Sequence, residues 1–527
     1  MRKSGGIAAF TTVAMSVGMA FSLTCVAATP AHAAGGVLRA RMNADIRSTD
    51  PGTNRDANTD GVMGHVVEGL VAFREDTSVG PMLAESWDIS EDGKTYTFHL
   101  RQGVKFHNGA TMTADDVVWS FKRWLDPATQ WRCLSEFSET GITKIIDVEA
   151  ADPRTVTIRL ERPTALFLGT LARPDCGQTA ILHHDSVGPD GKWIAPIATG
   201  PFKLGEWKRG QYIDLIRFDD YVSRAEPRDG YAGGKKVEVD KVRVNFIPDG
   251  SAAKAGLLSG SLDIVSNLST PDLDDLRTQP DVQLSITPGL GLTGILLQSK
   301  DPLLQDVRIR RALALSLDTK EIADAVMEGT ASANNSALPI GSPFHRAVED
   351  QGYTQDIAEA KKLLVEAGYK GQPIKLIANK RYSYVFDSAV LVQAMAQAVG
   401  LKIDIEVLDW AAQLDRYSKG DYQAMAFVYS ARLDPSLSFE MLTGPKATQP
   451  RKVWDNPEAE EMLRQSMLTI DPAKRQALFD EMHRRFIADV PMIVLFNGSE
   501  LSALRKSVKG YAGWLYPEPR FWGVSLQ

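Results

Sequence analysis

The pattern of apolar residues changes near residue 300, and this change limits the folds that the chain can adopt. Before it, short runs of alternating apolar and polar residues flank turn signals such as Asp92-Gly93 and Asp152-Pro153, which is typical of hairpins. After it, apolar runs such as "PIKLIAN" and "QAMAFVYS" alternate with helical stretches such as "DIAEAKKLLVEAG". The sequence therefore predicts an α/β protein with mixed sheets flanked by helices, whose second half contains a partly parallel sheet.

Several individual elements can be predicted from local signals. We expect a strand over 37–42, a helix over 60–73, hairpins over 86–106, 140–160 and 198–218, and a strand-helix-strand crossover over 236–265. In the second half, Asp306 is a candidate helix N-cap and Gly368 lies just past the end of a helix. The 527 residues exceed the ~250 to 300 at which a single core stops growing, so we expect two or three domains.

The stretch "RQGVKFHNGATMTADDVVWSFKRW", residues 101–124, raises the question of chemistry. His107, Asp115 and Asp116 are the groups that an acid-base site would use. However, Thr113 as N-cap with Asp116 at N3 fits a capping box, and Asp115 adds negative charge beside the positive end of the helix dipole. The His-Asn-Gly sequence that starts at residue 107 is typical of a turn, because Asn and Gly tolerate positive φ. These residues therefore indicate scaffold rather than a catalytic site.

Other motifs for metals, cofactors or catalysis are weak. His183, His184 and Asp185 form the densest potential metal cluster, but no HExxH or paired Cys-x-x-Cys spacing supports it, and we interpret it as a surface loop. "GLGLTG" (289–294) matches GxGxxG, yet a strand-like "ILLQSKDP" follows where a dinucleotide site needs a helix. We expect a flexible extended segment between two strands there. We predict no catalytic residue, no metal site and no cofactor.

The N-terminal residues indicate export. Residues 1–33 read as a secretory signal peptide, with cleavage near Ala33 after the small-x-small sequence Ala31-His32-Ala33. The alternative is an uncleaved anchor, because the uncharged stretch approaches the ~20 residues that span a bilayer. A lipid anchor on Cys25 is disfavoured by Thr24 before it. We expect a soluble periplasmic protein.

The charge composition limits the classes of molecule that the protein is expected to bind. The chain has 59 Lys and Arg against 66 Asp and Glu, and no basic cluster, which argues against nucleic acid. After the signal peptide only Cys133 and Cys176 remain. In an oxidising compartment they can pair, but sequence alone cannot show whether the geometry allows it.

A resemblance becomes visible in the stretch from 81 to 124. "PMLAESWDISEDGKTYTFHLRQGVKFHNGATMTADDVVWSFKRW" resembles the signature of the family 5 extracytoplasmic solute-binding proteins, the peptide and nickel class of receptors for ABC importers. "ATGPFKL", "IPDGSAAKAGLLSGSLDIV", "PLLQDVRIRRALALSLD", "AKKLLVEAGY" and "RFWGVSL" resemble further family blocks in the same order. The resemblance implies a two-lobed periplasmic-binding-protein fold, type II, of the large class with an extra domain. It also implies a monomer that works with ABC transporter permease subunits in the inner membrane.

The resemblance further implies domain limits. One lobe would combine a discontinuous domain, 34–80 with 197–296 and 500–527, and an extra domain, 81–196. The other lobe would span 297–499. The chain would cross between lobes near "GLGLTGILLQ" and "VLFNGSE", where glycines ease the backbone changes of a hinge.

The resemblance also suggests a ligand site. In "YSARLDP", Asp434 would hold a peptide α-ammonium, and in "NKRYSY", Arg381 would clamp a carboxylate. The alternative interpretation of Asp434 is a helix N-cap with proline at N1, as at Asp471-Pro472, and that of Arg381 is an exposed surface charge. Arg432 stands where dipeptide receptors carry an acidic, glycine-rich run, so it either neutralises Asp434 or binds an anionic group. Weaker candidates for the pocket are Tyr429, Trp410, Trp514 and Tyr516.

The expected function is therefore capture of a small solute. We expect a receptor for a short peptide or peptide-like compound, which performs no chemistry. The alternative within the family is a metal-chelate or haem receptor, in which Arg432 and Trp410 would contact the chelate. The alternative from another class is a secreted hydrolase, which would need a nucleophile-base pair that no recognisable motif supplies.

Overall fold

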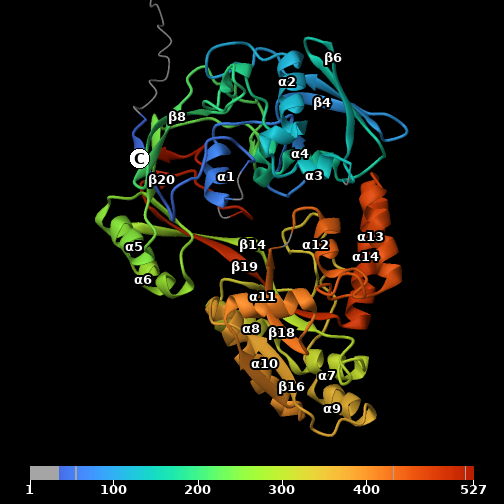
Figure 1. Cartoon of the computed structure of the whole chain (residues 1–527). Helices are drawn as coiled ribbons and strands as arrows, with labels where there is room; N and C mark the ends of the chain where they lie inside the picture. Colours follow the sequence, from blue (N-terminus) through green and yellow to red (C-terminus); the bar gives the residue numbers. More distant parts are fainter. Residues whose placement is uncertain (1–34, 54–55, 140, 431, 517) are drawn as a thin grey trace, which may run out of the picture. The chain divides into compact units, whose positions relative to one another are not determined.

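Two long neighbouring strands join the halves of the fold. β14 (Val282–Leu297) and β19 (Met492–Arg505) pair antiparallel along most of their lengths and run side by side through the middle of the view (Figure 1). The structure, a computed structural model, describes residues 35–53, 56–139, 141–430, 432–516 and 518–527. The expected signal peptide, 1–33, lies outside these described residues.

β14 and β19 belong to a mixed sheet that has 11 strands within the described residues. The strand order is β17-β16-β18-β14-β19-β13-β1-β12-β9-β8, with β15 paired to β19. β1 pairs in parallel with β12 and β13, and β16 pairs in parallel with β17 and β18, whereas the other pairs are antiparallel. The strands besides β14 and β19 are β1 (Val37–Met42), β8 (Phe202–Lys208), β9 (Tyr212–Arg217), β12 (Lys241–Phe246), β13 (Ile264–Ser266), β15 (Ser332–Ala333), β16 (Ile374–Ala378), β17 (Ile403–Val407) and β18 (Ala424–Ser430).

The strand-helix-strand crossover predicted over 236–265 is confirmed as β12, α5 (Gly250–Ser259) and β13. Asp249 caps α5 by accepting a hydrogen bond from Ala252 N, and Gly260 ends the helix at φ 79°. Both strands then pair with β1, as a parallel crossover requires.

The second half buries both faces of its strands, as continuous apolar runs predict. In β18, Ala424 and Ala426 face one apolar cluster, whereas Met425 and Phe427 face another. The first cluster is covered by α7 (Val307–Ser316), α8 (Thr319–Met327), α9 (Ile357–Glu366) and α10 (Ser383–Val399). The second is covered by α11 (Trp410–Lys419), α12 (Pro435–Leu442), α13 (Pro457–Leu468) and α14 (Pro472–Asp489).

A separate four-stranded antiparallel sheet lies within the predicted extra domain. Its strands follow the order β4 (Ala84–Ile89), β5 (Thr95–Leu100), β7 (Thr155–Leu160) and β6 (Ile145–Asp152), and α2 (Ala114–Leu125) packs against β6 and β7. Thr113 is the N-cap of α2, and Asp116 Oδ2 accepts from Thr113 N at 2.8 Å, so the predicted capping box is confirmed. Burial lowers the pKa of His107 to about 4, and its Nε2 lies 3.0 Å from Gly200 O. His107 is therefore a scaffold residue.

Two local predictions are wrong. The helix expected over 60–73 is only α1 (Ala57–Met63), and the chain continues to β2 (Val71–Phe73). Close backbone packing explains the early end, because a Cβ on Gly69 would lie 2.1 Å from Gln178 O. "GLGLTG" is not a link between strands either, since it lies inside β14, whose pairing with β19 shifts register between Pro288 and Leu292.

The remaining elements are short. They are β3 (Val79–Pro81), α3 (Leu134–Phe137), α4 (Phe167–Ala172), β10 (Arg228–Asp229), β11 (Ala232–Gly233), α6 (Leu273–Arg277), β20 (Val508–Lys509) and β21 (Ser525–Leu526).

Candidate ligand-binding site

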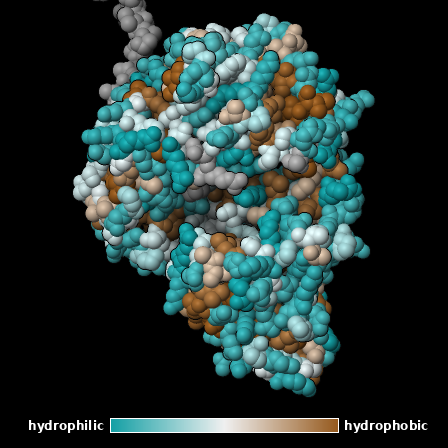
Figure 2. All heavy atoms as spheres, viewed as in Figure 1, coloured by the Kyte–Doolittle hydropathy of each residue, from teal (hydrophilic) through white to brown (hydrophobic). Residues whose placement is uncertain are grey.

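A cavity of about 770 Å³ opens between the segments assigned to the two lobes. The surface is hollowed between the upper and lower parts of the space-filling view (Figure 2). On one side the cavity is lined by α12 and the residues before it, and on the other by α3, α4 and the segment after α4. Its apolar lining residues are Phe73, Ile142, Leu166, Leu433, Leu437, Met441 and Met467. The size lies within the ~300 to 1,000 Å³ of small-molecule sites.

Three sequence-predicted residues meet at this cavity, namely Arg432, Asp434 and Tyr516. Asp434 is the N-cap of α12, where its Oδ1 accepts from Ser436 N at 2.9 Å. The same carboxylate pairs with Arg475 of α14, whose Nη2 lies 2.8 Å from Oδ1 and 2.9 Å from Oδ2. Asp434 thus lines the cavity and caps a helix, and its charge is already balanced within the second half of the chain.

The opposite wall carries an ion-pair cluster that the sequence did not reveal. Arg173 donates to Asp175 through Nε and Nη2 at 2.9 and 2.6 Å, and to Glu136 Oε1 through Nη1 at 2.5 Å. Burial opposes ionisation of Asp175, but Arg173, with Arg132 and Arg432 further off, holds the pKa of Asp175 below its ordinary value. No local spacing signals this cluster, because Glu136 and Arg173 meet only when the chain folds.

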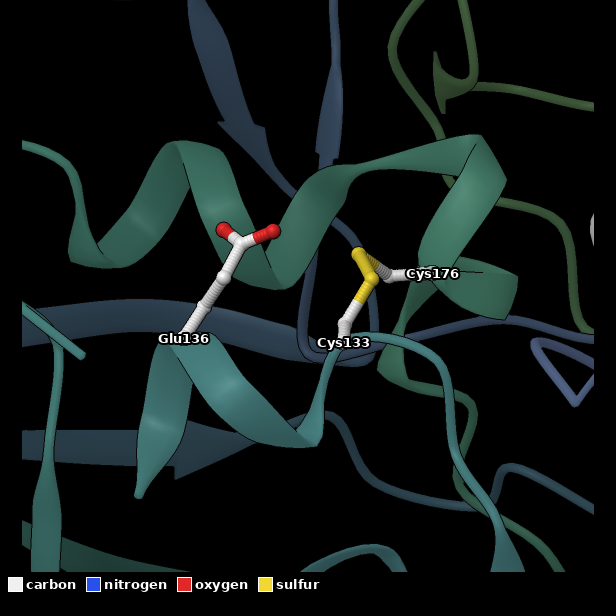
Figure 3. Close-up of side chains that lie close together, drawn as sticks. All are labelled: Cys133, Glu136 and Cys176. Carbon is white, nitrogen blue, oxygen red and sulfur yellow. A yellow bond between two sulfur atoms is a disulfide. The ribbon is translucent and has the colours of Figure 1, made fainter. Parts of the chain in front are cut away.

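A disulfide holds that cluster in place. Cys133 and Cys176 are bonded, with Cα atoms 5.7 Å apart, which answers the question that the sequence left open. Figure 3 shows the bridge beside Glu136. Cys133, Glu136 and Cys176 are close enough to suggest a metal site, but the sulfurs are bonded to each other and Glu136 pairs with Arg173.

His183, His184 and Asp185 also lie close together. His183 caps a short 3₁₀ turn over His184–Ser186, in which Asp185 N donates to His183 Nδ1 at 3.2 Å, so the backbone already uses that ring nitrogen. His184 and Asp185 are exposed. This geometry agrees with the surface-loop interpretation.

Arg381 and Trp410 lie together, but Arg381 lines a different cavity from Asp434. That second cavity, of about 680 Å³, also contacts Tyr382, Tyr384 and Ser499. The Arg381 guanidinium lies 5.8 Å from the ring centre of Trp410, which stacks on Phe427. Arg381 itself is exposed.

Tyr429 and Trp514 are core residues in this structure, with 7% and 4% of their surface exposed. Tyr429 Oη donates to Tyr417 Oη at 3.2 Å, and Trp514 Nε1 donates to Glu75 O at 2.9 Å. Their polar atoms are thus used inside the protein.

The two-lobed fold and the cavity between its lobes define a class, that of binding proteins which hold a ligand between domains. The chain belongs to the bacterial extracellular solute-binding proteins, family 5, because the model of that family's middle region matches residues 78–449. It is therefore a solute-binding protein of the class that serves ABC importers. Among the residues that the structure describes, no helix combines the length and apolarity needed to cross a membrane.

Two relatives and one solved structure illustrate the likeness. Heme-binding protein A of Haemophilus influenzae is 29% identical over 504 residues, which cover 90% of this chain and 88% of the relative. The dipeptide-binding protein of Escherichia coli is 29% identical over 502 residues, which cover 90% and 91%. The structure of HbpA2 from Haemophilus parasuis matches with a TM-score of 0.80 at 26% identity, over 93% of this chain and 100% of that one.

Proposed function

We propose that this protein is a periplasmic receptor that captures a short peptide or peptide-like solute between its lobes and delivers it to the permease subunits of an ABC importer. The observation that carries the proposal is the 770 Å³ cavity, which residues from both lobes line. The likeness to a dipeptide-binding protein supports a peptide-sized ligand. The long antiparallel pairing of β14 with β19, which runs between the segments assigned to the two lobes, supports a connection about which the lobes close on a ligand.

We propose further that the receptor works without catalysis. The described lining of the cavity contains no histidine and no cysteine. Its four carboxylates, Glu136, Asp175, Asp434 and Glu440, each pair with an arginine or lysine rather than with a nucleophile. A nucleophile-base pair is what a hydrolase of this kind would need.

A second candidate is a receptor for haem or a metal chelate. The likeness to heme-binding protein A over 90% of the chain favours it. Because the described lining contains no histidine or cysteine, such a ligand would be held by its organic part.

Thermal unfolding with a ligand panel tests these proposals. The panel contains di- and tripeptides, haemin, ferric chelates and sugars, each added to the purified mature protein. A ligand at ~100 times its Kd should add about 2.7 kcal/mol of stability. Stabilisation by peptides supports the first proposal, and stabilisation by haemin or chelates alone supports the second. Cleavage of the peptides, followed by mass spectrometry, would overturn the claim that no chemistry occurs.

The same panel locates the ligand's carboxylate. If the ligand lies wholly in the cavity of Arg432, Arg381→Ala should keep the wild-type stabilisation, because Arg381 lines the other cavity. If Arg381→Ala abolishes the stabilisation, Arg381 holds the ligand's carboxylate, as the family resemblance implies.

A further inference from the structure

Some charged side chains that line the 770 Å³ cavity have a partner of opposite charge within the protein, and others do not. Each of its carboxylates has a cationic partner within the protein. Arg173 pairs with both Glu136 and Asp175, Arg475 pairs with Asp434, and Lys452 Nζ lies 2.6 Å from Glu440 Oε1. A ligand ammonium entering this cavity would have to compete with a guanidinium or ammonium that is already in place.

Two guanidinium groups on the same walls have no such partner. Among the described residues, no carboxylate oxygen lies within 4.0 Å of the side chains of Arg432 or Arg451, and neither side chain makes a hydrogen bond. Both arginines are exposed, and both line the cavity from the second half of the chain. Arg432 is fixed through its backbone, because its N donates to Ser438 Oγ at 3.0 Å and its O accepts from that hydroxyl at 3.1 Å.

The rest of the lining complements an amphipathic molecule. Leu437 and Met441 of α12 face the cavity together with Leu166 and Met467. Tyr516 adds a hydroxyl, and burial raises the pKa of Tyr516 well above its ordinary value, so the phenol stays protonated and can donate. An apolar wall with free guanidinium groups suits a ligand that has an apolar body and an anionic end.

We propose that this receptor selects anionic, partly apolar solutes, whose carboxylate is held by Arg432 and Arg451, and that it needs no free ammonium on the ligand. The inference rests on the proposed function and narrows its ligand class. Arginine is suited to this role because its planar fork binds carboxylates through two parallel hydrogen bonds. Asp434 then acts as a helix cap and as the counter-ion of Arg475, rather than as the ammonium acceptor.

Titration calorimetry with three forms of one tripeptide and one neutral analogue tests the proposal. The probes are Leu-Phe-Glu with free ends, its N-acetyl form, its C-terminal amide, and N-acetyl Leu-Phe-Gln amide. We expect acetylation to change Kd by less than about threefold, and the fully neutral form to bind at least about tenfold more weakly, a difference near 1.4 kcal/mol. Azelate, a dicarboxylate with an apolar chain, extends the test beyond peptides and should compete with the acetylated peptide.

Single substitutions then locate the anion. Arg432→Gln and Arg451→Gln should each weaken binding of the N-acetyl peptide by about tenfold and leave the neutral peptide's affinity unchanged. Arg346→Gln is the matched control, because Arg346 is an exposed arginine of the same lobe outside the cavity lining. Unfolding midpoints of the variants show that each is folded.

The outcomes separate this inference from the proposed function. If the free peptide binds but acetylation abolishes binding, or if both arginine variants bind like wild type, the anionic-ligand proposal is overturned while the receptor stands. If neither these probes nor the wider ligand panel stabilises the protein, the proposed function itself is contradicted.

Discussion

Arg475 Nη2 lies 2.8 and 2.9 Å from the two carboxylate oxygens of Asp434, so the residue that the family resemblance assigns to the ligand is bound first by its own protein. The Arg475 side chain is 7% exposed and the Asp434 side chain 19%. Arg475 also donates through Nε to Ser466 O at 2.9 Å, which ties α14 to the end of α13. The pair thus holds the start of α12 against two neighbouring helices.

Asp434→Ala should therefore be more damaging than loss of an ordinary cap. We expect a loss of about 2 to 4 kcal/mol in the free energy of unfolding, because Arg475 is left buried without its counter-ion. Asp471→Ala is the matched control, since Asp471 caps α14 before a proline but is exposed, and it should lose only about 1 kcal/mol. Urea unfolding of the two variants measures the difference, and equal losses would show that the ion pair contributes nothing beyond the cap.

The pH dependence of stability should report on Glu518. Burial raises the pKa of Glu518 to about 8, and the charges of Asp60 and Glu500 add to the effect. The ordinary value is 4.5, so between these values the folded state binds a proton that the unfolded state has released. Stability therefore falls as pH rises from about 4.5 to 8, by at most about 1.4 kcal/mol per pH unit for this group.

Glu518→Gln removes the contribution of this side chain to the pH dependence of stability, because glutamine does not titrate. The variant should match wild type near pH 5 and become progressively more stable than wild type as the pH rises to 8. Unfolding temperatures measured across this range give the comparison, with Glu91→Gln, a change of an exposed glutamate, as control. A constant gap between Glu518→Gln and wild type at every pH would contradict the raised pKa.

The family-signature helix offers a test of scaffold against site. Thr113→Ala should cost about 1 kcal/mol of stability through the weakened cap of α2, and should leave ligand affinity unchanged. His107→Ala should also leave affinity unchanged, because its ring lies against Phe218 and Gly200 O rather than in the cavity. Ligand-induced shifts of the unfolding temperature check both variants. Loss of the shift in either variant would show that this stretch contributes to ligand binding.

Local signals predicted most of the fold because local chemistry determines those parts. Asp306 caps α7 by accepting from Arg308 N, and Gly368 follows α9 at φ 67°, as turn and cap rules require. The apolar run of β18 is buried on both faces, as predicted. The helix expected over 60–73 failed because Gly69 meets the backbone of Gln178, a long-range contact that periodicity cannot show.

The candidate site was less predictable for the same reason. Sequence motifs pointed to Asp434 and Arg432, which follow one strand, but Arg173 and Asp175 lie far away in the sequence and join them only through tertiary packing. Arg475 is far from Asp434 in sequence and looks like an ordinary residue of an amphipathic helix. Whether an acidic side chain is free or already paired depends on such contacts, so the preference for a ligand's charge could not be read from the sequence.

The disulfide should matter for binding as well as for stability. Cys133 precedes α3, which carries Glu136, and Cys176 follows Asp175, so the bridge connects the two segments that form one wall of the cavity. Its 43-residue separation predicts a contribution of about 4 kcal/mol from the restricted unfolded chain. We expect Cys133→Ala/Cys176→Ala to lose about 2 to 5 kcal/mol and to bind ligand more weakly than Thr113→Ala does, because the wall is freed. Alanine is chosen because both positions are buried and a serine hydroxyl there would need a partner.

Urea unfolding of the wild type and the double variant, with and without reductant, provides the measurement. Reductant should lower the unfolding midpoint of the wild type and leave that of the double variant unchanged. A shift of both midpoints would mean that the loss of the disulfide is not the cause.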